Sequence, residues 1–233
     1  SILEVFFTMK KVVSLLVAMF LIASLFVAFA EVPVEVLDNP YLVLVNKTTK
    51  LPNDWTNMVS FSVGKNSLGE LYIVESKALE AFEALRAYLL EEKGVQIELD
   101  SVYRSLEEQQ DIWDAWSADP EKGVEYCEQY LAPVGCSEHH TGLAIDVFLV
   151  KDGEIIRDND AMIAETEAFA KIHQHLAKFG FILRYLPEKE DITGYSYEPW
   201  HFRYIGNPAL AQSIMTAKIT FEEYHNLLQS TFN

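Results

Sequence analysis

Two short clusters in the sequence carry the side chains of a hydrolytic metal site. The first places His139 seven residues before Asp146, and the second, further along the chain, places Glu198 three residues before His201. Two histidines and a carboxylate are common protein ligands of a catalytic zinc ion, and a second carboxylate can act as the general base. The two clusters together predict a zinc peptidase with three metal ligands and one base.

Four further histidines compete for a role in this site. His140 directly follows His139, and since neighbouring residues normally face different sides, the sequence alone leaves open which of the two binds metal. His173 and His175 lie two apart on a predicted helix, where their side chains diverge by about 200°. They cannot share a metal ion, and we expect both to be peripheral. We expect His225 to lie on the surface of a C-terminal helix.

The residues around Asp146 predict space beside its carboxylate. We expect residues 142–147 to form a strand, because apolar residues alternate with small ones there. Asp146 then shares its face with Gly142 and Ala144, while branched apolar residues occupy the opposite face. The smallest side chains therefore leave room for an ion and its substrate.

The second cluster needs a bend in the chain. Pro199 excludes a helix interior, and in a regular strand two residues three apart face opposite sides. We therefore expect a bend near Pro199 that brings Glu198 and His201 to one cavity.

Arg104 is the candidate cation that would face the scissile carbonyl or a carboxylate. Ser105 and Glu108 form a capping box, so a helix begins directly after Arg104 and the preceding strand ends there. A guanidinium is permanently charged and its fork suits an oxyanion or a carboxylate. The other reading of Arg104 is an ordinary surface ion pair.

The remaining pattern predicts a single domain of the α+β class with a small, mainly antiparallel sheet, since strands pair like hairpins rather than alternate with helices. We expect strands at residues 41–45, 71–74, 95–103, 181–185 and 200–205. We expect four helices: one from Ser76 to the residue before Gly94, one that begins at Ser105, one over residues 160–179, and one that begins at Thr220.

Residues 1–30 have the composition of an export signal. Lys10 and Lys11 follow Met9, an apolar run covers residues 12–30, and the run ends in Ala-Phe-Ala. We expect residues 1–8 to precede the true start, and residues 31–233 to be the functional domain. The apolar run is also close to the ~20 residues that span a bilayer, so an uncleaved anchor is the alternative. Both readings place the domain outside the cytoplasm.

The charge balance restricts the partners of the chain. It has 18 basic and 35 acidic side chains, a net charge of −17. A surface this acidic argues against nucleic acids and anionic membrane surfaces as partners. We expect a soluble monomer whose only membrane contact would be the possible anchor.

The two cysteines, Cys127 and Cys136, leave two alternatives open. In an oxidising compartment they would form a disulfide that stiffens the loop before Ser137; otherwise they are two free thiols. We do not expect a thiolate zinc ligand, because histidine and aspartate already fill the site.

Four stretches together resemble the zinc D-alanyl-D-alanine carboxypeptidases of the VanY type. They are Ser137-x-His139-x6-Asp146, Glu198-Pro199-Trp200-His201-x-Arg203-Tyr204, Tyr103-Arg104-Ser105-x3-Gln109, and residues 43–52. The combination is specific to that family and covers most of residues 31–233.

The resemblance implies a compact Hedgehog/DD-peptidase-like fold, a Zn²⁺ cofactor and peptidoglycan stem peptides ending in D-Ala as the substrate. It implies that the zinc ligands are His139, Asp146 and His201, and that the catalytic base is Glu198. It further implies that Arg104 anchors the oxyanion or the substrate, that Ser137 and Gln109 contact the terminal D-Ala, and that Tyr185 forms a wall of the pocket.

Several alternatives stay open. Within the family, the chain would be a D,D-carboxypeptidase, an L,D-carboxypeptidase acting on tetrapeptide stems, or a D-Ala-D-Ala dipeptidase; export argues against the last. A non-catalytic zinc-containing domain that binds wall peptides would be expected to lose Glu198. A serine enzyme is unsupported, because the S-x-x-K match from Ser62 to Lys65 has no K-T-G partner.

Overall fold

A computed structural model describes residues 39–232, and residues 1–38 and 233 lie outside the described part. The predicted signal peptide or anchor of residues 1–30 is therefore outside it. Among residues 39–232, no helix is both long enough and apolar enough to cross a membrane.

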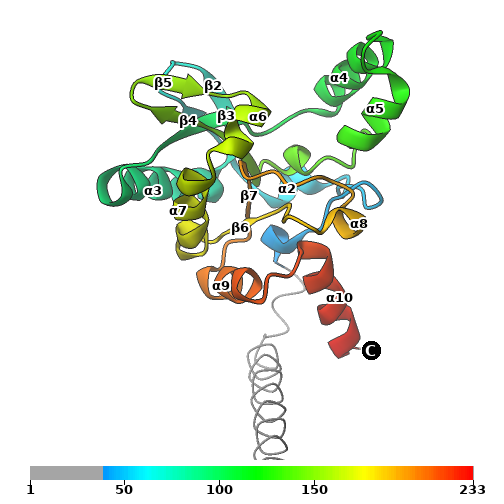
Figure 1. Ribbon diagram of the computed structural model, residues 1–233. Coiled ribbons are helices and arrows are strands. Elements are labelled where there is room, and N and C mark those ends of the chain that lie inside the picture. Colours follow the sequence, from blue (N-terminus) through cyan, green and yellow to red (C-terminus); the bar gives the residue numbers. More distant parts are fainter. Residues whose placement is uncertain (1–38, 233) are drawn as a thin grey trace, which may run out of the picture. The chain divides into compact units, whose positions relative to one another are not determined.

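The central sheet is antiparallel throughout, as the sequence predicts (Figure 1). It consists of β3 (Gln96–Ser101), β4 (Ala144–Lys151), β7 (His201–Tyr204) and β6 (Phe181–Leu183) in that order, with β5 (Glu154–Ile156) beside β4. A second, two-stranded sheet pairs β1 (Phe61–Lys65) with β2 (Leu71–Glu75). The α+β class with a small antiparallel sheet is confirmed.

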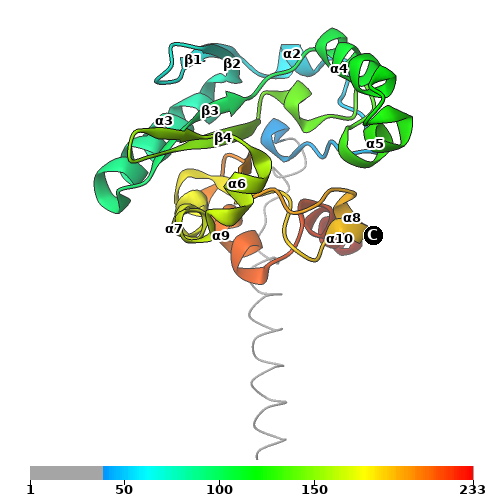
Figure 2. The ribbon, with the colours of Figure 1, turned by 45° about the horizontal axis from the view of Figure 1, so that its top comes forward.

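Helices surround the sheet. The α-helices are α2 (Trp55–Met58), α3 (Ser76–Lys93), α4 (Leu106–Ala118), α5 (Gly123–Tyr130), α6 (Asn159–Ala164), α7 (Thr166–Leu176), α8 (Glu190–Thr193), α9 (Pro208–Ala217) and α10 (Phe221–Phe232), and the 3₁₀ turns are η2 (Pro40–Leu42), η3 (Glu138–Thr141) and η4 (Ala177–Phe179). Figure 2 shows α4 and α5 side by side at one end of the domain, away from α3 and α7.

Local sequence signals explain where the helices begin and end. Ser105 and Glu108 form both reciprocal bonds of the predicted capping box at the start of α4. Gly94 ends α3 with a left-handed backbone (φ 64°), a conformation that costs glycine no steric penalty. Thr220 and Glu223 form the same reciprocal bonds at the start of α10.

One core holds these elements together. On α3 the side chains of Phe82, Leu85 and Leu89 are completely buried, and α3 contacts α7. The branched face of β4, represented by Ile145 and Val147, is buried in the same cluster. Each such side chain contributes roughly 1.5–3 kcal/mol of burial free energy. This core fixes β4, and with it the segment that carries Asp146.

Two predicted elements are wrong. Residues 41–45 form no strand, because η2 turns the chain there and Arg203 occupies the carbonyls of Tyr41 and Val43 with hydrogen bonds of 3.1 and 2.7 Å. Residues 160–179 do not form one helix. The backbone at Glu165 (φ −78°, ψ 48°) leaves the helical region, and the segment divides into α6, α7 and η4.

Gly142 does not belong to the strand, so the expectation that it leaves room for an ion beside Asp146 is wrong. It ends η3 with φ 69°, and β4 begins at Ala144. A Cβ at Gly142 would lie 2.6 Å from a ring carbon of Phe61 and 3.2 Å from the backbone nitrogen of Glu75. The glycine therefore accommodates a close packing of the two sheets rather than a substrate.

Candidate metal centre and active site

His139, Asp146 and His201 converge to form a candidate metal centre. One ligand atom from each lies within 4.8 Å of the others. His139 Nε2 is 3.2 Å from Asp146 Oδ2, and His201 Nδ1 is 2.8 Å from Asp146 Oδ1. Of the two adjacent histidines, His139 is therefore the one that faces Asp146.

The sheet and two turns place these three side chains. Asp146 of β4 pairs directly with His201 of β7. His139 lies in η3, where its backbone nitrogen donates to Ser137 Oγ at 3.3 Å. The predicted bend is present as a turn at Pro199 directly before β7, closed by a hydrogen bond of 3.3 Å from His201 N to the Glu198 carbonyl.

The outer contacts of both histidines suit metal ligands. His139 Nδ1 lies 2.7 Å from the Val102 carbonyl, which needs a proton on Nδ1 and leaves Nε2 as an acceptor. His201 Nε2 lies 3.2 Å from Glu138 Oε2, so Nδ1 is the nitrogen that is left to bind a metal ion. Such partners orient metal-bound imidazoles and raise their basicity.

The donor set fits a divalent cation. Within the described part of the chain, the buried Asp146 Oδ1 has no hydrogen-bond partner with acceptable geometry, although His201 Nδ1 is close to it. Burial favours neutral His201, but Asp146 and Glu138 outweigh it and raise the His201 pKa to about 10. The same negative field favours a metal ion, which would displace that proton. Two imidazoles and a carboxylate in a closed cluster suit zinc.

Glu138 is a functional residue that the sequence reasoning missed. Its carboxylate is buried, and burial opposes its ionisation, yet Arg184 and Arg203 beside it hold its pKa well below the usual range. A carboxylate that stays ionised there keeps His201 in its ligand tautomer. The sequence signal that could have indicated this role is the position of Glu138, an acidic residue directly before the predicted metal ligand His139.

Glu198 lies at the edge of the metal centre, as predicted. Its Oε2 is 3.8 Å from His201 Nδ1, and its side chain keeps 27% of its surface exposed. Burial, followed by repulsion from Asp146, raises the pKa of Glu198 to about 7, although His201 acts in the opposite direction. A carboxylate with a pKa near neutrality is suited to accept and return a proton.

Arg104 lines the same cleft and is held by two side chains. Its Nη1 donates to Gln109 Oε1 at 3.0 Å, and its Nη2 donates to Ser101 Oγ at 3.3 Å. Gln109 is fully buried, and its Nε2 donates to the Ala132 carbonyl at 2.8 Å. Gln109 therefore lies behind Arg104, and the contact of Gln109 with the substrate stays a prediction.

The cleft over the metal centre has a volume of ≈ 250 Å³. Ser137 and Tyr185 line it, as expected, and Tyr185 packs on His201 with ring centroids 4.8 Å apart. Its further walls come from residues that the sequence reasoning did not single out: Tyr195 next to Tyr185, the aromatic residues Trp116, Tyr126 and Tyr130 of α4 and α5, and the polar residues Asp100, Arg157 and Asn159.

His140 and His173 have structural roles close to the site. His140 Nδ1 lies 2.6 Å from the Arg104 carbonyl, and its Nε2 accepts from the Gly135 nitrogen at 3.2 Å. His173 Nε2 lies 2.9 Å from the Pro199 carbonyl, so His173 supports the turn between Glu198 and His201. The expectation that His173 is peripheral is wrong, because α7 packs beneath that turn.

The last two histidines differ from each other. His175 packs edge-on against the ring of Tyr88, with ring centroids 5.1 Å apart. His225 is half-buried rather than on the surface, with its ring edge-on to Phe221 at 4.7 Å. Burial, with a smaller effect of Arg203, lowers the His225 pKa to about 4.

Cys127 and Cys136 are free thiols, both buried, so of the two alternatives the structure has the unbridged one. Cys127 Sγ lies 3.8 Å from the Trp113 carbonyl. The S-x-x-K match also has no catalytic setting, because Ser62 and Lys65 lie in β1 and Ser62 Oγ bonds to Ser76 Oγ at 2.8 Å.

Comparison with known proteins shows the family of the chain. The family model "VanY: D-alanyl-D-alanine carboxypeptidase" matches residues 72–207. The bifunctional D-Ala-D-Ala dipeptidase and D-Ala-D-Ala carboxypeptidase VanXYC of Enterococcus gallinarum is 42% identical over 164 residues, which covers 70% of this chain and 82% of that protein.

Two solved structures are similar to the fold. The LD-carboxypeptidase LdcB has a TM-score of 0.69 and 32% identity, covering 81% of this chain and 87% of its own. A mutant of the vancomycin resistance D,D-pentapeptidase VanY, in complex with Zn(II), has a TM-score of 0.63 and 29% identity, covering 79% and 98%. The fold and the site have the architecture of the carboxypeptidases that these two structures represent. The chain belongs to the VanY family of D-alanyl-D-alanine carboxypeptidases.

Proposed function

We propose that the protein is a zinc-dependent D,D-carboxypeptidase that removes the terminal D-Ala from peptidoglycan stem peptides or their precursors. The observation that carries the proposal is the convergence of His139, Asp146 and His201, with Glu198 beside them in the same cleft. The substrate class follows from the family and from the activities that its relatives' names state.

His139, Asp146 and His201 would hold the zinc ion. Zinc in such a site supplies Lewis-acid activation of water and of the scissile carbonyl group. Glu198 takes a proton from the attacking water and returns it to the amine nitrogen of the departing D-Ala. In the metal-free protein burial raises the pKa of Glu198 to about 7, and a zinc ion nearby would lower it, which favours the carboxylate that accepts the first proton.

Arg104 supplies the fixed positive charge of the cleft. Ser101 and Gln109 each accept one hydrogen bond from its guanidinium, so its direction is set before the substrate arrives. A guanidinium held in this way can face the oxyanion or the terminal carboxylate of the peptide without reorganisation. Ser137 and Tyr185 lie on the cleft wall where the terminal D-Ala would be held.

An L,D-carboxypeptidase acting on tetrapeptide stems is the second candidate. Its support is the similarity to LdcB, an LD-carboxypeptidase with 32% identity. The two activities differ in the residue that precedes the terminal D-Ala. The catalytic groups proposed here serve either activity, and the walls of the cleft would select between them.

We also propose that the domain acts outside the cytoplasm, where stem peptides of the wall are found. The support is the sequence of residues 9–30, a basic start followed by an apolar run that ends in small residues. This would place the enzyme on the side of its substrate. Detecting the protein by protease treatment of intact cells would check it, and complete protection of the domain would contradict it.

The experiment that tests the proposed activity compares two peptides. The zinc-loaded protein is incubated with a pentapeptide stem ending in D-Ala-D-Ala and, separately, with the tetrapeptide that lacks the last residue. We expect mass spectrometry to show conversion of pentapeptide to tetrapeptide with no shortening of the tetrapeptide. Cleavage of the tetrapeptide alone would replace this proposal by the L,D activity.

A further inference from the structure

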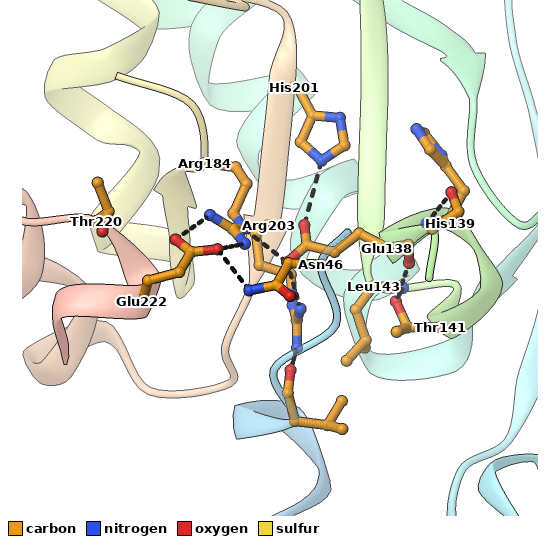
Figure 3. A network of polar contacts seen from close by, with 12 residues as sticks. Asn46, Glu138, His139, Thr141, Leu143, Arg184, His201, Arg203, Thr220 and Glu222 are labelled. Atoms are coloured by element: carbon orange, nitrogen blue, oxygen red, sulfur yellow. Dashed lines mark hydrogen bonds and ion pairs between the residues drawn. The ribbon is translucent and has the colours of Figure 1, made fainter. Parts of the chain in front are cut away.

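A buried network of charges extends away from the metal ligand His201. Glu138 Oε2 lies 3.2 Å from His201 Nε2. Glu138 Oε1 accepts from Arg184 Nε at 2.7 Å and from Arg203 Nη1 at 2.8 Å (Figure 3). One carboxylate therefore joins a metal ligand to two arginines.

The network continues to the C-terminal helix. The two terminal nitrogens of Arg184 donate to the two oxygens of Glu222 at 2.8 and 2.6 Å. Glu222 Oε1 also accepts from Asn46 Nδ2 at 3.2 Å, as Figure 3 shows. Glu222 lies in the first turn of α10. Paired bonds of this kind fix the orientation of both groups.

The network is buried and its charges balance. Arg184 and Arg203 are 0% exposed, Glu138 is 3% exposed and Glu222 is 8% exposed. Arg203 is further held by the carbonyls of the N-terminal segment, so it cannot turn to replace a missing partner. Two carboxylates meet two guanidinium groups. Loss of any one would leave a buried charge without its counter-charge.

We propose that Glu222 is a positioning residue of the metal centre, acting through Arg184 and Glu138 on the orientation of His201. Glu222 lies outside residues 72–207, the region that the family model matches, and α10 thereby becomes part of the support of the site. The inference rests on the proposed function, since it requires that His201 binds zinc.

The physical reason is competition for Glu138. With Glu222 present, the two outer nitrogens of Arg184 are occupied, and only Nε is directed at Glu138. Without the Glu222 charge, the whole Arg184 fork is free to turn towards Glu138 and draw its carboxylate away from His201. Loss of such an outer partner typically weakens metal affinity by about 10–100-fold.

The test is Glu222→Gln in the full-length protein, with Glu223→Gln as the matched control. Glu223 is the next residue of α10; its side chain pairs with Lys189 and with Thr220 at the start of the helix, and neither of these two residues belongs to the network. The readouts are the zinc Kd by chelator competition and the visible absorption spectrum of the Co²⁺-loaded protein. Both are independent of peptidase activity.

We expect Glu222→Gln to raise the zinc Kd by roughly 10–100-fold and to change the Co²⁺ spectrum. Glu223→Gln should lower the melting temperature but leave both readouts at the parent values. The double variant Arg184→Met/Glu222→Met leaves Glu138 paired with Arg203 alone, so it should bind zinc more tightly than Glu222→Gln.

An unchanged zinc Kd and Co²⁺ spectrum in Glu222→Gln would overturn the inference and leave the proposed function standing. A parent protein that binds no zinc would instead remove the proposed function. If Glu222→Gln fails to fold, Glu222→Asp replaces it, because it keeps the charge but withdraws it from Arg184. Parent-like values in that variant overturn the inference equally.

Discussion

Replacing Glu198 by glutamine should change activity and stability in opposite directions. The amide keeps the shape of the side chain but can no longer accept a proton from water. Loss of a general base lowers the rate by about 10²–10⁴-fold. Because Glu198 is not among the three metal-binding side chains, the variant should still bind one zinc ion.

The effect on stability follows from the raised pKa of Glu198. Burial moves this pKa from the ordinary 4.5 to about 7 in the folded, metal-free protein. The unfolded chain is therefore ionised above pH 4.5 while the folded chain holds its proton up to pH 7. Stability is lost as the pH rises through this window, by about 3 kcal/mol at most.

Solvent screening makes the loss of stability smaller than this maximum, because 27% of the Glu198 side chain is exposed. We therefore expect Glu198→Gln to stabilise the metal-free protein by about 1–2 kcal/mol at pH 8 and by little at pH 4. Urea unfolding at the two pH values measures the difference, and D-Ala release with saturating zinc measures the rate. Parent-like turnover in the variant would refute Glu198 as the base, and equal stability gains at both pH values would refute the electrostatic reasoning.

Three further predictions concern Arg104, Gly142 and His225. Arg104→Ala should lower kcat/KM by about 10²–10³-fold. Arg104→Lys should restore only part of the lost activity, because lysine lacks the fork that Gln109 holds; full activity of the lysine variant would contradict the role of the guanidinium. Gly142→Ala should destabilise the fold by about 2–4 kcal/mol, measured by urea unfolding, since alanine is strained at φ 69° and meets the Phe61 ring. A neutral result would show that the two sheets separate easily. His225 has a pKa lowered from 6.5 to about 4, so the folded protein should lose stability as the pH falls through that window, by on the order of 1–3 kcal/mol. His225→Phe should reduce this loss, and an identical pH profile would exclude His225 as its source.

The sequence predicts the site well where the determinants are local. The turn at Pro199, the capping box at Ser105 and the left-handed end of α3 at Gly94 each follow from residues within one turn of the chain. The alternation of β4 correctly places Asp146 on the face opposite Ile145 and Val147, which lie in the core cluster, although Ala144 and Phe148 on the face of Asp146 are buried as well. These signals carry directly into structure because no distant contact competes with them.

The errors arise where distant segments decide the local structure. Arg203 binds the carbonyls of Tyr41 and Val43 from the far end of the sequence, so a strand-like stretch becomes a 3₁₀ turn and a loop. Gly142 was expected to make room for an ion, yet the ring that fills its space comes from the other sheet. Such tertiary contacts have no signature within a short window of sequence.

The residues missed in the site have the same origin. Glu138 is a positioning group only because Arg184 and Arg203 are buried beside it, and those two arginines lie on different strands or strand ends. Gln109 was singled out as a substrate contact, and its burial on α4 and its bond to Arg104 could not be read from the sequence. The residue types in the sequence indicate the chemistry of the site, but which side chains face the cleft and which support them depends on how the fold buries them.

The proposed mechanism depends on a zinc ion held by His139, Asp146 and His201. The most direct test titrates zinc into metal-free protein while D-Ala release from a pentapeptide ending in D-Ala-D-Ala is measured. We predict that D-Ala release is absent at the start, rises linearly and reaches its plateau at one zinc per chain. D-Ala release that is independent of zinc, or absent at every zinc ratio in a folded protein, would exclude hydrolysis at this zinc site.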